Sequence, residues 1–235
     1  MGVVESEHPS LINVRYHDQL QPLSIKIVRA FVEEVGLPVI LKPRDGAGSI
    51  GTHRATTKAE LEQALSRFVP EMVEEMMVGK ERSFETASIR GVPQWDSHTR
   101  YDPAPLVVLE NPWIQWCVIL PREEETSDTQ AIRPVAHAAL KVLGMHTGIS
   151  HMEWFRRNDG SVAVSEVGAR PPGAQIVTLN SWAHEVDVYR KWAELVALDR
   201  WSMPPRKYAV AAAFFLYPVA WYLLHRHRRR RRVAD

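Results

Sequence analysis

The fold of this chain can be inferred from the stretch His151-Met-Glu-Trp-Phe-Arg-Arg-Asn-Asp-Gly-Ser-Val-Ala-Val-Ser-Glu166. Asp159-Gly160 in its middle is typical of a two-residue type I′ turn, so the stretch predicts a β-hairpin. In that register Glu153 lies directly opposite Glu166, with Cβ atoms roughly 4.5 to 5.5 Å apart. Two carboxylates about 5 Å apart, at an effective dielectric constant of about 20, repel each other by roughly 3 kcal/mol.

A divalent cation held between the two carboxylates would compensate for this repulsion, because Mg²⁺ and Mn²⁺ prefer hard oxygen ligands. The interpretation depends on the register of the hairpin. An Asn158-Asp159 loop would make the carboxylates diagonal neighbours on one face, whereas a three-residue loop would separate them onto opposite faces. The alternative is two solvated surface glutamates, which the hairpin alone favours.

Length and composition are those of an ordinary soluble protein, since the chain has 235 residues, of which 45% are hydrophobic and 24% charged. This is enough for a sizeable core in one or two domains. One cysteine, Cys117, excludes an internal disulfide and favours a reducing compartment, so we expect a cytoplasmic protein without a secretory signal.

Residues 225–235 hold six of the 29 basic residues and one of the 28 acidic ones, which leaves a body of net charge −4. A mildly acidic body excludes a broad nucleic-acid-binding face.

Periodicity, capping signals and glycine or proline positions predict the order of elements. Helices are expected over residues 24–35, 57–69, 129–143 and 186–198, the second of them beginning with a Thr57–Glu60 capping box. Strands are expected over residues 38–42, 71–77, 82–89, 106–109, 116–120 and 208–216, besides the two arms of the hairpin. The polar segment 92–105 is expected to be a loop.

Lys42 ends a predicted strand and precedes the glycine-rich loop Arg44-Asp-Gly-Ala-Gly-Ser-Ile-Gly51. Backbone N–H groups of such a loop can close over phosphates while the ammonium supplies positive charge. The order differs from a Walker A loop, in which the lysine follows the glycines. Further on, the strand Val73-Glu-Glu-Met-Met-Val-Gly-Lys-Glu81 has carboxylates at both ends, which suit an adenine amine and a ribose. Taken alone, the glycine-rich loop is better explained as a tight surface turn, and a charged edge strand is a credible alternative for residues 73–81.

Four motifs in this order resemble the ATP-grasp superfamily. They are Lys42-Pro with Gly46-Ala-Gly-Ser-Ile-Gly51, then Val73-Glu-Glu with Gly79-Lys-Glu81, then Thr147-Gly-Ile-Ser-His-Met-Glu153, then Glu166-Val-Gly-Ala-Arg170-Pro-Pro-Gly173. The resemblance covers roughly residues 24–216. It implies an α+β fold in which two α+β subdomains, residues 24–78 and 79–216, clasp ATP between antiparallel sheets. Residues 1–23 would be an N-terminal extension.

The resemblance also implies a role for each matching residue. Lys42 would contact the α- and β-phosphates, and the lid over the triphosphate would include Gly46, Gly48, Ser49 and Gly51. Glu74 would accept from the adenine amine, Met76 or Met77 would offer main-chain contacts, and Glu81 would bind the ribose. Glu153 and Glu166 would hold two Mg²⁺ (or Mn²⁺) ions, with Glu166 bridging them. Arg170 would stabilise an anionic acyl-phosphate or the oxyanion formed from it.

The implied activity is that of a ligase. Mg-ATP would activate a small-molecule carboxylate as an acyl-phosphate, which an amine or a thiol then attacks, releasing ADP and phosphate overall. The alternative is a truncated protein that binds ATP without ligase turnover. No specific nucleic-acid partner is expected.

The sequence departs from the family pattern at three places. Gly168 stands where many members have a metal-binding Asn. An N-terminal substrate-binding domain and an additional phosphate-contacting basic residue are expected to be absent. The arginine-rich tail 217–235 matches nothing in the family, and we expect it to be disordered.

One further segment and four residues have alternative interpretations. The uncharged run 208–224, which contains Pro218, is at the lower length limit for a membrane span, so we favour a family strand over an anchor. We expect His151 to bond nearby backbone rather than metal or substrate. Trp113 and Trp116 are expected in the core rather than in a substrate pocket, and Cys117 is expected to be buried and inert.

Overall fold

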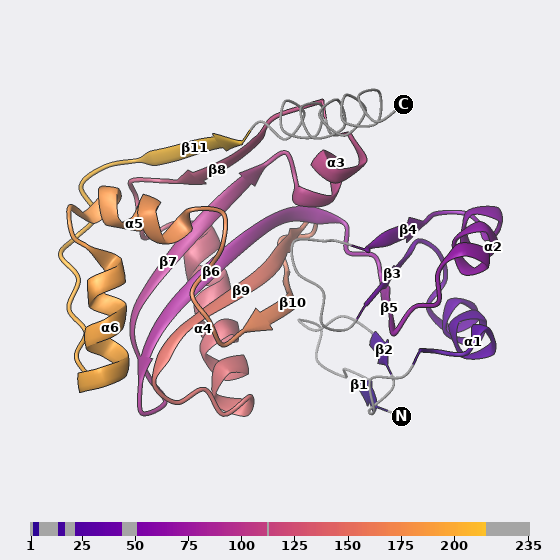
Figure 1. Cartoon of the computed structure of the whole chain (residues 1–235), viewed down its shortest axis with the longest axis horizontal. Coiled ribbons are helices and arrows are strands. Elements are labelled where there is room, and N and C mark those ends of the chain that lie inside the picture. The colour runs from indigo at the N-terminus through magenta and orange to yellow at the C-terminus, as the bar shows by residue number, and fades with distance from the viewer. Residues whose placement is uncertain (1, 5–13, 17–21, 44–50, 112, 215–235) are drawn as a thin grey trace, which may run out of the picture. The chain divides into compact units, whose positions relative to one another are not determined.

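The computed structural model describes residues 2–4, 14–16, 22–43, 51–111 and 113–214 (Figure 1). The glycine residues 46 and 48, Ser49 and the arginine-rich tail therefore lie outside the described residues. The chain divides into two compact units. The first contains residues 1–80 and 155–165, and the second contains residues 81–154 and 166–235.

The first unit contains an antiparallel five-stranded sheet with the strand order β1-β2-β5-β3-β4. Its strands are β1 (Gly2–Val4), β2 (Val14–Tyr16), β3 (Val39–Lys42), β4 (His53–Ala55) and β5 (Met72–Glu75). Its helices are α1 (Ile25–Val35) and α2 (Lys58–Arg67). Part of the expected N-terminal extension thus forms strands, because β2 pairs with β5.

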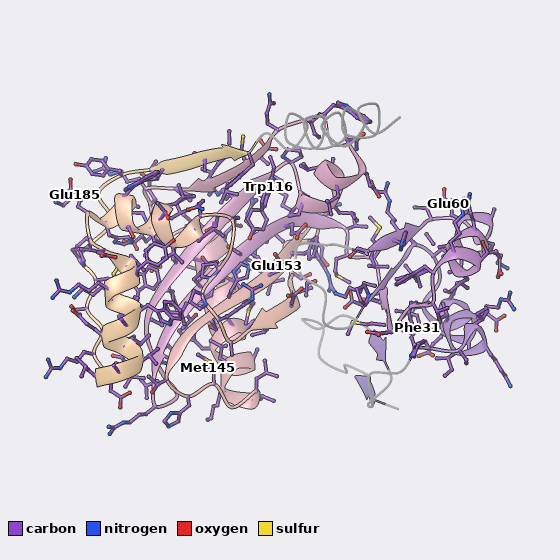
Figure 2. All side chains as sticks on the ribbon, viewed as in Figure 1. Phe31, Glu60, Trp116, Met145, Glu153 and Glu185 are labelled. Carbon is purple, nitrogen blue, oxygen red and sulfur yellow. The ribbon has the colours of Figure 1, made fainter. Side chains whose placement is uncertain are left out.

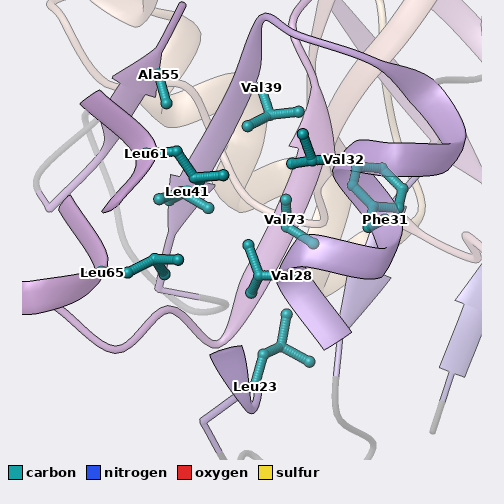
Figure 3. Close-up of a cluster of buried hydrophobic side chains, with 10 residues drawn as sticks. All are labelled: Leu23, Val28, Phe31, Val32, Val39, Leu41, Ala55, Leu61, Leu65 and Val73. Atoms are coloured by element: carbon teal, nitrogen blue, oxygen red, sulfur yellow. The ribbon is translucent and has the colours of Figure 1, made fainter. Parts of the chain in front are cut away.

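The two helices and one face of this sheet bury the core of the first unit (Figure 3). Val39, Leu41 and Val73 supply the sheet side and are fully buried. Ala55 on β4 is also buried, and the remaining members come from the helices and the segment before α1: Leu23, Val28, Phe31, Val32, Leu61 and Leu65. Fully burying one large apolar side chain stabilises a fold by about 1.5–3 kcal/mol. Because side chains alternate along a strand, the residues between these positions lie on the other face of the sheet.

Both helices of the first unit have capped ends, and the predicted capping box of the second helix is confirmed. Ser24 caps α1, since its side chain accepts from the N–H of Ile27, and Gly36 ends the helix with φ of 82°. In α2 the N–H of Glu60 donates to Thr57 Oγ1 and the N–H of Thr57 donates to Glu60 Oε2, so the capping box is complete.

The second sheet has the strand order β10-β9-β6-β7-β8-β11. Its strands are β6 (Gly79–Ile89), β7 (Val92–Asp102), β8 (Trp116–Leu120), β9 (Gly148–Arg157), β10 (Val162–Gly168) and β11 (Val210–Phe214). The helices are α3 (Pro105–Glu110), α4 (Ser127–Val142), α5 (Ile176–His184) and α6 (Val188–Leu198). In Figure 1, α5 lies beside β8 and β11, which it also contacts, and α6 follows it. No helix within the described ranges has both the length and the apolar character required to cross a bilayer.

The expected loop at 92–105 was wrong, because residues 92–102 form β7, which pairs with β6 and β8. The strand is polar, yet several of its central residues are buried, and some of their polar groups are paired with side chains outside the strand. Asp96 accepts from Arg133 Nε at 3.0 Å, and Ser97 Oγ donates to Asn180 Oδ1 at 2.9 Å. Side chains from α4 and α5 therefore supply partners for Asp96 and Ser97 in a strand that has no apolar alternation.

The expected strand at 106–109 was also wrong, because this short apolar run lies within α3. Pro105 occupies the first helical turn, where its missing N–H has no cost, and Asn111 ends the helix. A short apolar run does not by itself distinguish strand from helix.

The predicted type I′ turn was wrong as well. Such a turn needs positive φ at both central residues, but among Asn158, Asp159 and Gly160 only Gly160 has it, with φ of 84°. The N–H of Gly160 donates to the carbonyl of Arg157 at 3.0 Å, and the N–H of Arg157 donates to the carbonyl of Ser161 at 2.9 Å. These bonds define a three-residue loop with Gly160 as a G1 bulge.

Candidate functional site

Lys42 and Glu74 form an ion pair on the sheet of the first unit. In the register of β3 and β5, Lys42 pairs with Met72 and Ile40 pairs with Glu74, so Lys42 and Glu74 are diagonal neighbours. Both lie on the face opposite the apolar core. Lys42 Nζ is 2.8 Å from Glu74 Oε1, with side-chain exposures of 19% and 7%. A pair this well shielded is held firmly, because removal of one partner would leave the other charge uncompensated.

Gly51 is the one member of the predicted lid within the described residues. Its φ is 76°, a conformation that side chains rarely adopt, and an added Cβ would lie 3.3 Å from Pro43 Cδ. The backbone at the end of the lid therefore requires glycine.

The segment after β5 contains the predicted adenine contacts. The N–H of Met76 donates to the carbonyl of Pro38 at 3.1 Å, which favours Met77 over Met76 for a main-chain contact with a base. The thioether of Met77 accepts from Arg157 Nη2 at 3.4 Å. At Gly79 an added Cβ would lie 2.4 Å from the carbonyl oxygen of Arg156, so this close backbone approach excludes any side chain.

In the second unit, Glu85, His151 and Glu153 lie together on neighbouring strands β6 and β9. Nδ1 of His151 is 2.9 Å from Glu85 Oε1, and Nε2 of the same ring is 3.7 Å from Glu153 Oε1. The first contact is a hydrogen bond, whereas the second is an ion-pair distance. Figure 2 labels Glu153 on its strand of the sheet. The structure thus corrects the expectation that His151 bonds to nearby backbone.

Two carboxylates hold His151 in its protonated form. Burial of the ring is the largest single influence and opposes protonation, but the contacts with Glu153 and Glu85 together outweigh it. They raise the pKa of His151 to about 9. The site therefore holds one cation between two anions at neutral pH.

The remaining predicted residues of the second unit are more exposed. Glu81 on β6 is half-buried, and Glu166 near the end of β10 is exposed. The exposed Arg170 donates from Nη1 to the carbonyl of Pro171 at 3.1 Å. An added Cβ at Gly168 would lie 3.4 Å from the Arg170 side chain, so the space of a side chain at position 168 is occupied by Arg170.

The donor set suits a hard divalent cation, although it is small. Glu153 and Glu166 offer carboxylate oxygens, and the Glu153 side chain is 29% exposed. Within the described ranges no group of three or more His, Cys, Asp or Glu residues has the arrangement of a metal site. An ion here would therefore complete its coordination with water or with the phosphates of a nucleotide, as Mg²⁺ usually does.

Glu85 was not among the residues predicted from the sequence, and the predicted location of Trp113 was wrong. Glu85 is 1% exposed and lies within an expected strand. A carboxylate among apolar and small residues is the sequence signal that could have indicated it. Trp113, expected in the core, is 65% exposed. Trp116 packs against Tyr101 and Phe214, as a core residue does, while Cys117 is only half-buried.

Comparison with known proteins gives a family match over most of the chain. A model of the ATP-grasp domain matches residues 18–184. The D-alanine--D-alanine ligase of Geobacillus thermodenitrificans is 25% identical over 186 residues, which cover 71% of this chain and 48% of the ligase. The chain thus spans about half the length of this relative.

Two solved structures share the fold. The L-amino acid ligase of Bacillus licheniformis superposes with a TM-score of 0.55 at 21% identity, covering 80% of this chain and 43% of the ligase. The carboxyaminoimidazole ribonucleotide synthase of Aspergillus clavatus, solved in complex with ATP, gives a TM-score of 0.65 at 15% identity, covering 86% and 51%.

Proposed function

The chain belongs to the ATP-grasp family, and we propose that it is an ATP-dependent ligase that joins a carboxylate to an amine or a thiol. The observation that supports an ATP site most directly is the ion pair of Lys42 and Glu74 on the sheet face opposite the core. A strand-end lysine of fixed orientation is suited to bind phosphate oxygens, because its ammonium has three N–H donors and Glu74 Oε1 engages only one side of it.

We assign the nucleotide contacts as follows. Lys42 binds the α- and β-phosphates beneath the glycine-rich lid. Glu74 orients Lys42 and accepts from the adenine amine. The main chain of Met77 contacts the base, and Glu81 binds the ribose hydroxyls.

Glu153 and Glu166 are proposed to hold Mg²⁺, or Mn²⁺ in its place, with up to two ions. A bound ion supplies charge neutralisation of the β- and γ-phosphates, which lets an anionic substrate approach them. In the register set by the three-residue turn, an unbroken ladder would place Glu153 opposite Ser165 and Glu166 opposite Met152. Joint binding of one ion by both carboxylates therefore requires a β-bulge between the turn and Glu166.

The proposed reaction has two steps. A carboxylate oxygen of the substrate attacks the γ-phosphorus, the bond to the β-phosphate oxygen breaks, and ADP leaves. The amine or thiol then attacks the carbonyl carbon of the acyl-phosphate, loses a proton, and phosphate leaves. Arg170 stabilises the oxyanion of this second step, since its exposed guanidinium retains N–H donors beyond the one that contacts Pro171.

Amino acids are the first substrates to test, because two of the similar proteins are ligases named for D-alanine and for L-amino acids. ADP release should be measured over a panel of amino acids supplied as carboxylate and amine, with and without Mg²⁺. ADP release that depends on both a carboxylate and an amine supports the ligase. Tight binding of Mg-ATP without turnover on any acid, amine or thiol would favour the truncated ATP-binding protein instead.

Two lysine variants test the nucleotide assignment. Lys42→Gln should weaken ATP binding by about 10- to 150-fold, since a hydrogen bond to a charged group contributes roughly 1.5–3 kcal/mol. Lys26→Gln, which changes an exposed lysine on α1, is the matched control and should leave the affinity unchanged. Equal affinities of the two variants in isothermal titration calorimetry would contradict the assignment.

A double-mutant cycle tests whether Glu153 and Glu166 share an ion. If they do, Glu153→Gln and Glu166→Gln should each weaken Mn²⁺ binding to the ATP-loaded protein, and the double variant should lose less than the sum of the two. Strictly additive losses would indicate separate ions.

A further inference from the structure

Glu85 is a carboxylate in the middle of β6 that is only 1% exposed. Burial of a charged carboxylate is costly unless hydrogen bonds satisfy it. Oε1 of Glu85 accepts from His151 Nδ1 at 2.9 Å, and Oε2 is 3.4 Å from Thr99 Oγ1 on β7. Glu85 therefore has a partner on each of the two strands that flank β6.

The contacts of Glu85 continue toward the surface through His151. His151 and Glu153 are two residues apart on β9, so their side chains lie on the same face of the sheet. Side-chain exposure rises from 1% at Glu85 to 8% at His151 and 29% at Glu153. The three residues thus link the interior of the sheet to the half-exposed carboxylate.

The imidazole ring is oriented by its stronger contact. With Nδ1–H donated to Glu85, the ring has little freedom to turn about its bond to Cβ, and its Nε2 edge stays beside Glu153 Oε1 at 3.7 Å. Only one oxygen of Glu153 is used in this contact.

We propose that Glu85 is a positioning residue for metal binding: through its hydrogen bond to His151 it holds Glu153 with one carboxylate oxygen presented to the ion. This inference rests on the proposed role of Glu153 in holding Mg²⁺. Outer residues that hydrogen-bond to metal ligands typically change metal affinity by about 10- to 100-fold when they are replaced. Glu85 itself need not touch the ion or the nucleotide.

Two substitutions at Glu85 separate hydrogen bonding from charge. Glu85→Leu removes the acceptor at similar volume and should weaken Mn²⁺ binding to the ADP-loaded protein by about 10-fold or more, measured by the electron paramagnetic resonance of free Mn²⁺. Glu85→Gln keeps an acceptor oxygen for Nδ1–H and should bind Mn²⁺ within about threefold of the unmodified protein. Thr99→Val removes the weaker contact and is the control, with unchanged affinity.

The orientation of His151 gives a second readout that does not involve the metal. Nitrogen-15 NMR of the histidine rings should show Nδ1 of His151 hydrogen-bonded in the unmodified protein and in Glu85→Gln, but not in Glu85→Leu. If Glu85→Leu does not fold, His151→Asn replaces it: this variant removes the Nε2 edge and should lower Mn²⁺ affinity to the same extent.

The outcomes distinguish the two proposals. Glu85→Leu, or His151→Asn in its place, with unchanged Mn²⁺ affinity would overturn the positioning role, as would a Glu85→Gln variant that loses as much affinity as Glu153→Gln. If Glu153→Gln itself binds Mn²⁺ normally, the metal assignment fails, and the positioning role fails with it. Loss in Glu153→Gln without loss in Glu85→Leu leaves the metal assignment standing and rejects the positioning role alone.

Discussion

A buried histidine should make the protein less stable in mild acid. His98 on β7 is 1% exposed, and its Nε2 has no hydrogen-bond partner within the described part of the chain. Burial, followed by the positive charges of Arg206 and Arg100, lowers its pKa from 6.5 to about 4. In the unfolded chain His98 therefore binds a proton near pH 6.5, whereas in the folded chain it binds one only near pH 4. The stabilising contribution is complete above pH 6.5 and is lost as the pH falls toward 4.

The expected size of this loss follows from the two pKa values. Between pH 7 and pH 5 the difference in proton binding destabilises the fold by about 2 kcal/mol. Urea unfolding, followed by tryptophan fluorescence at both pH values, measures the change in the free energy of unfolding. The carboxylates titrate equally in the unmodified protein and in His98→Leu, so the difference between their acid losses isolates the contribution of His98. Between pH 7 and pH 5 the unmodified protein should lose about 2 kcal/mol more unfolding free energy than His98→Leu. Exposed His146 supplies the control, since His146→Leu should retain the full acid loss. Equal losses in the unmodified protein and His98→Leu would show that protonation of His98 does not cause the acid destabilisation.

Three other predictions concern stability. Gly79→Ala should destabilise the protein by about 1–3 kcal/mol in urea unfolding, because its Cβ would lie 2.4 Å from a backbone oxygen of Arg156. Gly173→Ala, where an added Cβ meets nothing within 4 Å, should be nearly neutral, and equal effects of the two would contradict the argument. Arg206→Lys should lower the free energy of unfolding by about 3 kcal/mol or more. A lysine cannot replace the buried guanidinium, which donates to Ser97, Pro121 and Asn180. An unchanged melting temperature would exclude this loss of stability. The raised pKa of His151 gives stability that is complete below pH 6.5 and is lost as the pH rises through about 9. His151→Asn in EDTA should abolish that alkaline loss, and an identical alkaline profile would disprove it.

Local signals were sufficient for helices α1, α2, α4 and α6 and for the apolar strands β3 and β8, whereas they predicted a strand within α3 and did not indicate α5. The ends of α1 and α2 are marked by residues that act locally. The side chains of Ser24, Thr57 and Glu60 bond to backbone N–H groups within three residues, and Gly36 adopts the positive φ that ends α1. The strands at 38–42 and 116–120 were predictable because their apolar residues enter a core. In both cases the information lies in consecutive residues.

The polar interior of the second unit was not predictable, because its buried polar residues depend on partners that are distant in the sequence. Ser97 is buried because Asn180 and Arg206 lie beside it, and these partners come from positions 83 and 109 residues further along the chain. Glu85 likewise depends on His151, which is 66 residues away. A single sequence gives the polar residue but not its partner, so a strand of this kind resembles a loop.

The hairpin shows how one turn residue changes a functional argument. Asp159-Gly160 does mark the turn, but the carboxylate of Asp159 accepts from the N–H and the hydroxyl of Ser161 at 2.8 and 2.7 Å. These bonds, with Gly160 in the bulge position, make the loop one residue longer than a type I′ turn allows. Because side chains alternate along a strand, one extra residue would place Glu166 on the other face relative to Glu153 if the ladder beyond the turn is unbroken. The sequence therefore identifies both carboxylates but not their geometry, and the coupling measured between Glu153→Gln and Glu166→Gln determines whether a bulge returns them to one ion.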